Sequence, residues 1–435
     1  MRIIKTTDRV SGAILREIIN RASRDNMEIE KKVKRILSDI EKEGDKAVIK
    51  YTELYDGISL KPSEIRVSRD KIKRACKSVN KKTLKSLEIS AERIKRFHEK
   101  ERLNSWFTVE DGSILGQLRR PLRRIGVYVP GGKAAYPSSV LMNVIPAKVA
   151  GVSEIAMCVP MPAGDINSYI LAAADIAGVT EIYRIGGAQA IGAMAYGTRT
   201  TPKVDKIVGP GNIYVATAKR LVFGMVDIDM MAGPSEILII ADEKADPEFI
   251  AADLLSQAEH DEMASSILLT DSKSLALKTE KEVSKQLKKT KRKMIAEKSL
   301  KKYGAIIVTK NMIEAIDIAN EIAPEHLEIM VERPFEIIGK IKNAGAIFLG
   351  PWTPEAVGDY SAGPNHVLPT GGTARFFSPL GVEDFMKRTS FLSFTREGLE
   401  GIGGTVISIA EIEGLKAHGD SVRIRLKKDS RLKKG

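Results

Sequence analysis

"RRIGVYVPGGKAAYPSSVLMNVIPAKVAGVSEIAMCVP" (123–160) is the segment that decides the fold class. It opens with a short β-branched run that ends at a proline and two glycines. It continues as a mostly apolar helical stretch and closes with a second β-branched run. A strand, a helix and a strand in this order form the repeating unit of a parallel sheet covered by helices.

Two series of such units follow one another along the chain. The first continues with the strand-like runs "EIYRIGG" (181–187) and "VDKIVGP" (204–210), each followed by a helical stretch. A second series begins at residue 236 and contains the runs "EILIIAD", "SSILLT", "AIIVT", "LEIMV" and "AIFLG". We therefore predict an α/β protein with two doubly wound units, which an old duplication would explain.

The flanking parts of the chain have a different character. Residues 1–118 are rich in charge and carry apolar residues at helical spacing, which predicts an N-terminal helical region. We place the first doubly wound unit at 119–236 and the second at 237–375. The alternation breaks down after residue 376, so 376–435 is expected to form a small C-terminal tail.

Composition is that of an ordinary soluble protein. The chain has 435 residues, of which 43% are hydrophobic and 29% are charged. No apolar run approaches the roughly 20 residues of a membrane span, and no secretory signal is expected from the first residues. Cys76 and Cys158 are the only cysteines, which is typical of a reducing compartment. We therefore expect a cytoplasmic protein without a membrane partner.

The formal charge of +13 raises the alternative of a nucleic-acid-binding protein. The densest basic runs are 285–294 and the last residues of the tail. Aromatic residues make up only 5% of the chain and do not interleave with these runs, as a base-stacking surface requires. Solvated helix faces are the favoured interpretation, and no nucleic-acid partner is predicted.

Histidines mark the candidate chemistry. Of the five, His98 lies in a charged helical stretch and is expected to be exposed. The other four lie in loops or at helix ends beside polar groups: His260, His326, His366 and His418. Several glycine-rich loops follow predicted strands, and in open α/β sheets ligands bind outside the carboxyl ends of the strands.

Gln257 and His260 are three residues apart near a predicted helix end and so share one face, as two metal ligands can. They would need stronger partners, for which Asp359 and His418 are candidates. This mixed nitrogen and oxygen set suits Zn²⁺, with Mn²⁺ or Co²⁺ conceivable. The alternatives are a polar helix end for His260 and a turn residue for Asp359.

"IAPEHLEIM" (322–330) places a carboxylate beside an imidazole. A helix start is one interpretation, because Pro324 and Glu325 suit the first helical turn. A short turn feeding the strand "LEIMV" is the other, and it would let Glu325 and His326 point into one cleft. Such a pair can relay protons.

Evidence for a dinucleotide site is weak in the sequence. "GPGNIY" (209–214) has Gly-x-Gly without the third glycine of the Rossmann fingerprint. No acidic residue follows a predicted strand about 20 residues further on. A nicotinamide cofactor would therefore bind without the standard fingerprint.

Together, the motifs resemble the histidinol dehydrogenase family in order and spacing. The resemblance runs from about residue 25 to 425. It is carried by the motifs "RRIGVYVPGG", "GGAQAIGAMAYGT", "VDKIVGPGN", "AGPSE", "DLLSQAEHD", "APEHL", "AGAIFLG", "GDYSAGPNHVLPT" and "AHGDSVRIR". It implies two incomplete Rossmann-like domains, a homodimer with an exchanged tail and shared active sites, and oxidation of L-histidinol through an aldehyde to L-histidine with two NAD⁺.

The resemblance also implies roles for individual residues. One Zn²⁺ per subunit, for which Mn²⁺ can substitute, would be held by Gln257, His260, Asp359 and His418 and would anchor the substrate. Glu325 and His326 would be the acid/base pair, with His326 also contacting substrate. Further substrate contacts would be Ser235, His366 and Glu413, and the positions facing NAD would be Tyr128, Gln189 and Asn212.

Two other activities compete with this interpretation. A covalent aldehyde dehydrogenase needs a reactive cysteine, but Cys76 lies in a lysine-rich helix and Cys158 lies within an apolar strand, so this mechanism is rejected. A related dehydrogenase of another amino alcohol or a diol remains an alternative.

Overall fold

The computed structural model describes residues 1–8, 11–19, 27–131, 136–162, 164, 166–230 and 233–428. The chain divides into two compact units. Unit 1 comprises Met1–Glu101 and Leu122–Phe385, and unit 2 comprises Arg102–Pro121 and Met386–Gly435.

The first sheet of unit 1 has the strand order β6-β5-β4-β7-β8, and all its pairs are parallel. The strands are β4 (Arg124–Tyr128), β5 (Glu154–Cys158), β6 (Glu181–Tyr183), β7 (Lys206–Val208) and β8 (Asp227–Ile228). The connecting helices are α7 (Pro137–Ala150), α8 (Ser168–Ala177), α9 (Gly187–Tyr196) and α10 (Ile213–Val222). The strand order reverses between β4 and β7, and the carboxyl ends of strands at such a point commonly bind ligands.

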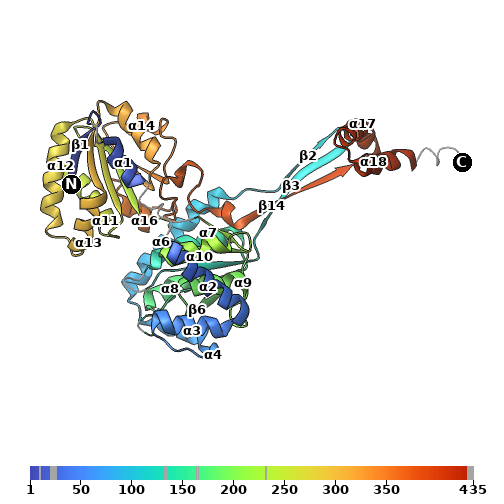
Figure 1. The fold of residues 1–435 in the computed structure, drawn as a ribbon, viewed down its shortest axis with the longest axis horizontal. Coiled ribbons are helices and arrows are strands. Elements are labelled where there is room, and N and C mark those ends of the chain that lie inside the picture. Colours follow the sequence, from blue (N-terminus) through green and yellow to red (C-terminus); the bar gives the residue numbers. More distant parts are fainter. Residues whose placement is uncertain are drawn as a thin grey trace. The chain divides into compact units, whose positions relative to one another are not determined.

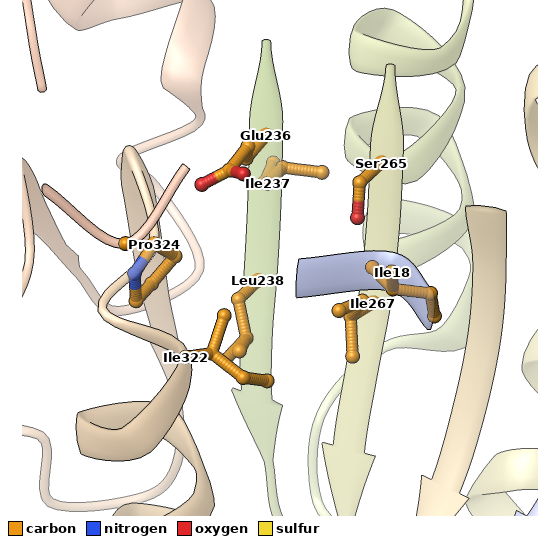
Figure 2. A pocket seen from close by; sticks show the side chains of 9 residues that line it. Ile18, Glu236, Ile237, Leu238, Ser265, Ile267, Ile322 and Pro324 are labelled. Carbon is orange, nitrogen blue, oxygen red and sulfur yellow. The ribbon is translucent and has the colours of Figure 1, made fainter. Parts of the chain in front are cut away.

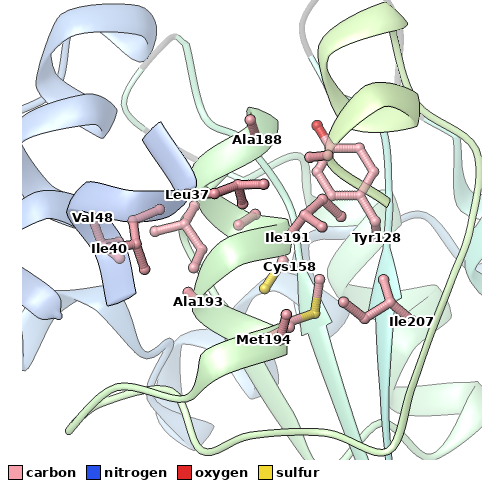
Figure 3. Close-up of a cluster of buried hydrophobic side chains, with 14 of the residues drawn as sticks. Leu37, Ile40, Val48, Tyr128, Cys158, Ala188, Ile191, Ala193, Met194 and Ile207 are labelled. Atoms are coloured by element: carbon pink, nitrogen blue, oxygen red, sulfur yellow. The ribbon is translucent and has the colours of Figure 1, made fainter. Parts of the chain in front are cut away.

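Helices from the start of the chain form a further layer, most of them packed on the connecting helices. They are α2 (Met27–Glu43), α3 (Asp45–Asp56), α4 (Pro62–Ile65), α5 (Arg69–Ser78) and α6 (Lys81–His98). Figure 3 shows α9 lying between α2 and the strands, with Leu37 and Ile40 directed at it. A Cβ on Gly192 would lie 2.9 Å from the Ile40 side chain, so glycine permits this close helix contact.

The second sheet repeats this topology. Its order is β1-β11-β10-β9-β12-β13, again with parallel pairs. The strands are β1 (Arg2–Lys5), β9 (Glu236–Ala241), β10 (Ser265–Thr270), β11 (Gly304–Val308), β12 (His326–Met330) and β13 (Ala346–Leu349). Numbered from its own first strand, each series has the order 3-2-1-4-5, which fits the expected pair of doubly wound units.

Helices cover both faces of the second sheet (Figure 1), because successive β9 side chains enter opposite cores. Ile237 and Ile239 pack on one side, and Leu238 and Ile240 pack on the other. The helices are α1 (Ser11–Ile19), α11 (Pro247–Ala258), α12 (Lys273–Leu287), α13 (Lys293–Tyr303), α14 (Met312–Ile322), α15 (Phe335–Ile338) and α16 (Glu355–Tyr360).

The strands within residues 1–118 correct the expectation of a helical region there. Strands β2 (Trp106–Glu110) and β3 (Ser113–Pro121) form an antiparallel sheet with β14 (Met386–Phe394), while β1 joins the second sheet of unit 1. Helices α17 (Arg396–Ile412) and α18 (Lys416–Lys428) complete unit 2 (Figure 1). The partner of β3 in the pair with β14 lies some 270 residues away, whereas β2 and β3 pair locally across Asp111 and Gly112.

The burial of His98 and Cys158 can be compared with what the sequence predicted. His98 is buried rather than exposed, because its Nδ1 lies 2.8 Å from Glu101 Oε2 and its ring packs on Phe97. Cys158 is buried in β5 as expected, and burial raises the pKa of its thiol. Within the described residues, no helix is long and apolar enough to cross a membrane.

Candidate active site

The segment between α14 and β12 brings Glu325 and His326 together. Helix α14 ends at Ile322, and the next residue, Ala323, has a φ of +50° that turns the chain sharply. The carbonyls of Pro324 and Glu325 then accept hydrogen bonds from the amides of Gly345 and Ala346 at 2.9 Å each. His326 opens β12 directly afterwards, so the turn-and-strand alternative is correct and the helix start is wrong.

Glu325 is held by an exchange of hydrogen bonds with Glu236. The Glu236 amide donates to Glu325 Oε2 at 2.9 Å, and the Glu325 amide donates to Glu236 Oε2 at 3.3 Å. Figure 2 shows Glu236 reaching toward the Pro324 segment. The cavity of about 10 Å³ in that figure holds roughly one water, so it is not the substrate site. Burial raises the pKa of Glu325 to about 7.

His326 has one committed and one available ring nitrogen. Nδ1 lies 3.0 Å from the Glu236 carbonyl oxygen, and because a carbonyl only accepts, Nδ1 carries the hydrogen. Gln257 Nε2 lies 3.1 Å from the same Nδ1, and because both nitrogens carry hydrogen in this tautomer, that contact is not a hydrogen bond. Among the described residues, the buried Nε2 of His326 has no hydrogen-bond partner, with Asp359 Oδ1 3.7 Å away. Nε2 is therefore positioned to act as a base.

The charge on His326 is set by opposing effects. Burial lowers its pKa, but Glu355, Glu325 and Asp359 outweigh burial and raise it well above the usual value. Glu355 Oε1 lies 3.5 Å and Glu325 Oε2 lies 3.7 Å from Nδ1. A cation bound among these carboxylates would oppose that rise.

Three side chains form a compact donor cluster: His260, Glu355 and Asp359 each offer one atom within 4.8 Å of the others. Glu355 and Asp359 lie four residues apart on α16, and His260 lies just beyond α11. One Glu355 oxygen, Oε2, is buried and has no hydrogen-bond partner within the described chain. An imidazole with two carboxylates suits Zn²⁺ or Mn²⁺, so these residues fit a metal.

The ionisation of the donors also fits a cation. Burial raises the pKa of Glu355 to about 8. Burial alone would also raise the pKa of Asp359, but His326, His366 and His260 lower it overall. The His260 imidazole reaches solvent, yet the surrounding protein lowers its pKa, which favours the neutral ligand form.

A second pair of acids lies behind the cluster. Asp253 on α11 faces Glu328 on β12, and burial raises the pKa of Asp253 to about 6 and that of Glu328 well above its usual value. Glu328 Oε1 accepts a 2.8 Å hydrogen bond from the Glu355 amide. It thereby holds the start of α16.

This pair predicts a pH-dependent stability. A raised pKa in the folded state means that the fold binds the Asp253 proton more tightly than the unfolded chain does. The free energy of unfolding should therefore fall as pH rises from 4 to 6, and stay lower above 6. Asp253→Asn, which mimics the protonated acid, should recover about 1 to 2 kcal/mol at pH 7 and little at pH 4.

Urea unfolding at both pH values measures this difference, with the exposed Asp271→Asn as control. An equal change in the free energy of unfolding on Asp253→Asn at the two pH values would contradict the raised pKa of Asp253.

The structure places the remaining expected metal and substrate residues as follows. Gln257 is buried on α11 against His326. His366 Nδ1 donates to the Asp359 carbonyl at 2.9 Å, and burial lowers its pKa. Ser235 directly precedes β9, and its carbonyl accepts from the Ser265 amide. His418 lies on α18 and Glu413 ends α17, both in unit 2.

The expected NAD-facing residues lie at the point where the first sheet reverses. Tyr128 ends β4, and its hydroxyl accepts a hydrogen bond from the Gly187 amide at 3.1 Å. Gln189 is buried, and within the described residues neither of its amide atoms has a partner. Asn212 is exposed and caps α10 through Oδ1. A buried, unpartnered amide in such a position fits a ligand.

One statement about the dinucleotide fingerprint is wrong. Asp229 directly follows β8 and lies 20 positions after Gly209, which is where the fingerprint places its acid. Strand β8 has only two residues, and its apolar pattern is too short to predict from the sequence.

Sequence reasoning missed Glu236 and Glu355. The i, i+4 spacing of Glu355 and Asp359 was a usable signal, because it puts two carboxylates on one helix face. Glu236 had no such signal. Moreover, Glu236 and His326 each begin a strand, so this part of the site lies at the amino ends of β9 and β12, not the expected carboxyl ends.

Comparisons with known proteins agree in one family. The family model described as histidinol dehydrogenase matches residues 19–426. A histidinol dehydrogenase of Caldanaerobacter subterraneus subsp. tengcongensis is 56% identical, covering 97% of this chain and 98% of that protein. One from Syntrophotalea carbinolica is 52% identical, covering 98% and 99%. The crystal structure of histidinol dehydrogenase from Elizabethkingia anophelis is 40% identical, covers 98% of each chain and superposes with a TM-score of 0.93.

Proposed function

The chain belongs to the histidinol dehydrogenase family, and on that premise we propose how its residues carry out the NAD-dependent oxidation of L-histidinol to L-histidine, the end of histidine biosynthesis. The observation that carries the proposal is the available Nε2 of His326, buried beside Glu325 and facing the donor cluster. A base and a second proton-transfer group therefore share one site.

His260, Gln257 and Asp359 would hold the metal, and Glu355 would add a further oxygen to the cluster. Zn²⁺, or Mn²⁺ in its place, supplies a positively charged anchor for the imidazole and amino groups of the substrate. Ser235 and His366 contact the substrate from the same unit.

The first oxidation needs a base for the alcohol proton. His326 Nε2 takes that proton while the carbon gives its hydride to NAD⁺, forming histidinal. Nδ1 keeps its hydrogen bond to the Glu236 carbonyl throughout, so the ring orientation is preserved.

The second oxidation needs water as well as a base. Glu325, with a pKa near 7, takes a proton from the water that adds to the aldehyde carbon. His326 then takes a hydroxyl proton of the hydrate as its carbon loses the second hydride, for which a second NAD⁺ would be the acceptor. One alcohol, one water and two NAD⁺ give one carboxylate, two NADH and three protons.

Substrate choice tests the proposed function. L-histidinol should yield two NADH and one L-histidine, whereas amino alcohols lacking the imidazole and simple diols should react far more slowly. Equal rates across such a panel would favour the alternative of a dehydrogenase for another alcohol.

The two-cysteine composition further supports a cytoplasmic enzyme.

A homodimer with shared sites is also part of the proposal. Unit 2 exposes large apolar side chains on a small sheet and two helices, including Trp106, Phe107, Leu392 and Ile412. Such a surface is stabilised by packing on a second copy. His418 of the partner subunit would then complete the metal site, and Glu413 of the partner subunit would contact substrate.

Mixed dimers test this sharing. In a dimer of one Asp359→Ala chain and one His418→Ala chain, one site carries both lesions and the other carries neither. Co-folding the two inactive variants should restore activity at up to about half of the sites in each mixed dimer. Mixed dimers that co-purify through different tags, yet stay as inactive as each single variant, would place His418 in its own chain's site.

A further inference from the structure

The first sheet holds a buried ion pair directly behind the loop that leads to Asn212. Lys219, on the inner face of α10, pairs with Asp229, which follows β8. Their side chains are 3% and 1% exposed. The loop itself, Gly209–Asn212, joins β7 to α10.

Both backbone groups of Gly209 bind to this pair. The Gly209 amide donates to Asp229 Oδ2 at 2.8 Å, and Lys219 Nζ donates to the Gly209 carbonyl at 3.0 Å. Lys219 also donates to Asp229 Oδ1. The pair therefore binds the peptide groups on both sides of Gly209, which restricts the backbone conformation of that residue.

Gly209 is also the point where the loop touches β4. Its φ is +109°, and a Cβ there would lie 2.1 Å from the Tyr128 carbonyl oxygen. Holding Gly209 therefore sets the distance between the end of β4, which carries Tyr128, and the loop that ends at Asn212. Asn212 then fixes α10 by accepting hydrogen bonds from the amides of Tyr214 and Val215.

Stability alone does not account for such a pair. Burying two charges is costly before their attraction is counted, and well-packed apolar replacements are often as stable. Charged groups, unlike apolar ones, form directed hydrogen bonds, and here each binds one particular backbone atom of Gly209.

Asp229 stands where the dinucleotide fingerprint places the acid that binds a ribose hydroxyl. Here both carboxylate oxygens are already engaged, and the group is buried. A ribose contact would require breaking the grip on Gly209.

We propose that Lys219 and Asp229 are positioning residues for the nicotinamide cofactor, acting through the Gly209–Asn212 loop without touching the cofactor. This rests on the proposed function, in which Tyr128 and Asn212 face NAD. The pair then sets affinity for NAD⁺ and for NADP⁺ to the same extent, because it shapes the loop and does not read the ribose.

The first test replaces both charges in the metal-loaded enzyme with Lys219→Met/Asp229→Leu. Calorimetric titration should show NAD⁺ and NADP⁺ both binding roughly 10- to 100-fold more weakly, as misplaced binding groups typically cause. Binding of L-histidine without NAD should be unchanged, and the melting temperature should change little. Glu181→Gln is the matched control, since it weakens the Arg124 ion pair at the amino ends of the same sheet.

The second test needs no variant. Hydrogen exchange should find the Gly209 amide protected before any cofactor is added, because Asp229 already binds it. Rapid exchange that slows only with NAD⁺ would overturn the proposal, even if the double variant failed to fold.

Other results would also overturn it. One is unchanged NAD⁺ affinity in a folded double variant. Another is a shifted preference between NAD⁺ and NADP⁺, which would mean that Asp229 contacts the ribose. Asn212→Ala and Tyr128→Phe distinguish failure of the proposed NAD site from failure of the positioning role. If neither variant alters NAD⁺ binding, the proposed NAD site itself is wrong.

Discussion

Removing the metal should abolish the oxidation of L-histidinol, and adding Zn²⁺ or Mn²⁺ should restore it. His260, Glu355 and Asp359 converge within 4.8 Å, which brings two carboxyl groups together in a place where a bound cation relieves their repulsion. Without the metal, the substrate loses its anchor near His326, and the reacting carbon is no longer held against the base.

The metal dependence is measured by dialysing the enzyme against a chelator and then following its metal content by elemental analysis and its activity by NADH formation. Asp359→Asn should lose both metal and activity. His98→Gln is a suitable control, because His98 is a buried histidine that pairs with Glu101 outside the donor cluster. Full turnover by protein shown to be free of metal would refute the metal site.

Glu325→Gln should slow oxidation of histidinal far more than oxidation of histidinol, because only the aldehyde step needs an activated water. The expected loss is about 10²- to 10⁴-fold. A glutamine oxygen can still accept the 2.9 Å hydrogen bond from the Glu236 amide, so the turn should keep its shape. His326→Ala should slow both steps, because both need the base at Nε2.

Single-turnover measurements with histidinol and with histidinal as separate substrates resolve the two half-reactions. Circular dichroism and metal content should match the unaltered protein for Glu325→Gln. An equal loss in both half-reactions would show that Glu325 and His326 do not divide the chemistry as proposed.

Much of the fold could be read from local pattern. The alternation that begins at 123–160 predicted two doubly wound sheets. In each sheet, the five strands of that series have the order 3-2-1-4-5. Apolar runs such as "EILIIAD" predict buried strands because parallel strands covered on both faces need continuous apolar sequence. Strands β2 and β3 were missed, because β14, the second partner of β3, is distant in sequence and the side chains of β2 are largely exposed.

The candidate site divides in the same way. The adjacency of Glu325 and His326 and the spacing of Gln257 and His260 are written in the chain, and motif order was sufficient to name a family. Whether Glu325 and His326 share a cleft depended on the turn at Ala323 and on hydrogen bonds from Gly345 and Ala346. Those contacts join segments that no local pattern links.

By itself, then, the sequence determined which elements form and which residue types are available for chemistry, because both follow from periodicity and composition within short windows. The tertiary structure alone decided that Glu236 supports Glu325, that Glu355 joins His260 and Asp359, and that Lys219 and Asp229 hold Gly209. These outcomes depend on which strands become neighbours. A buried carboxylate or ammonium takes on its role only when its hydrogen-bond partners and the loss of water around it are in place.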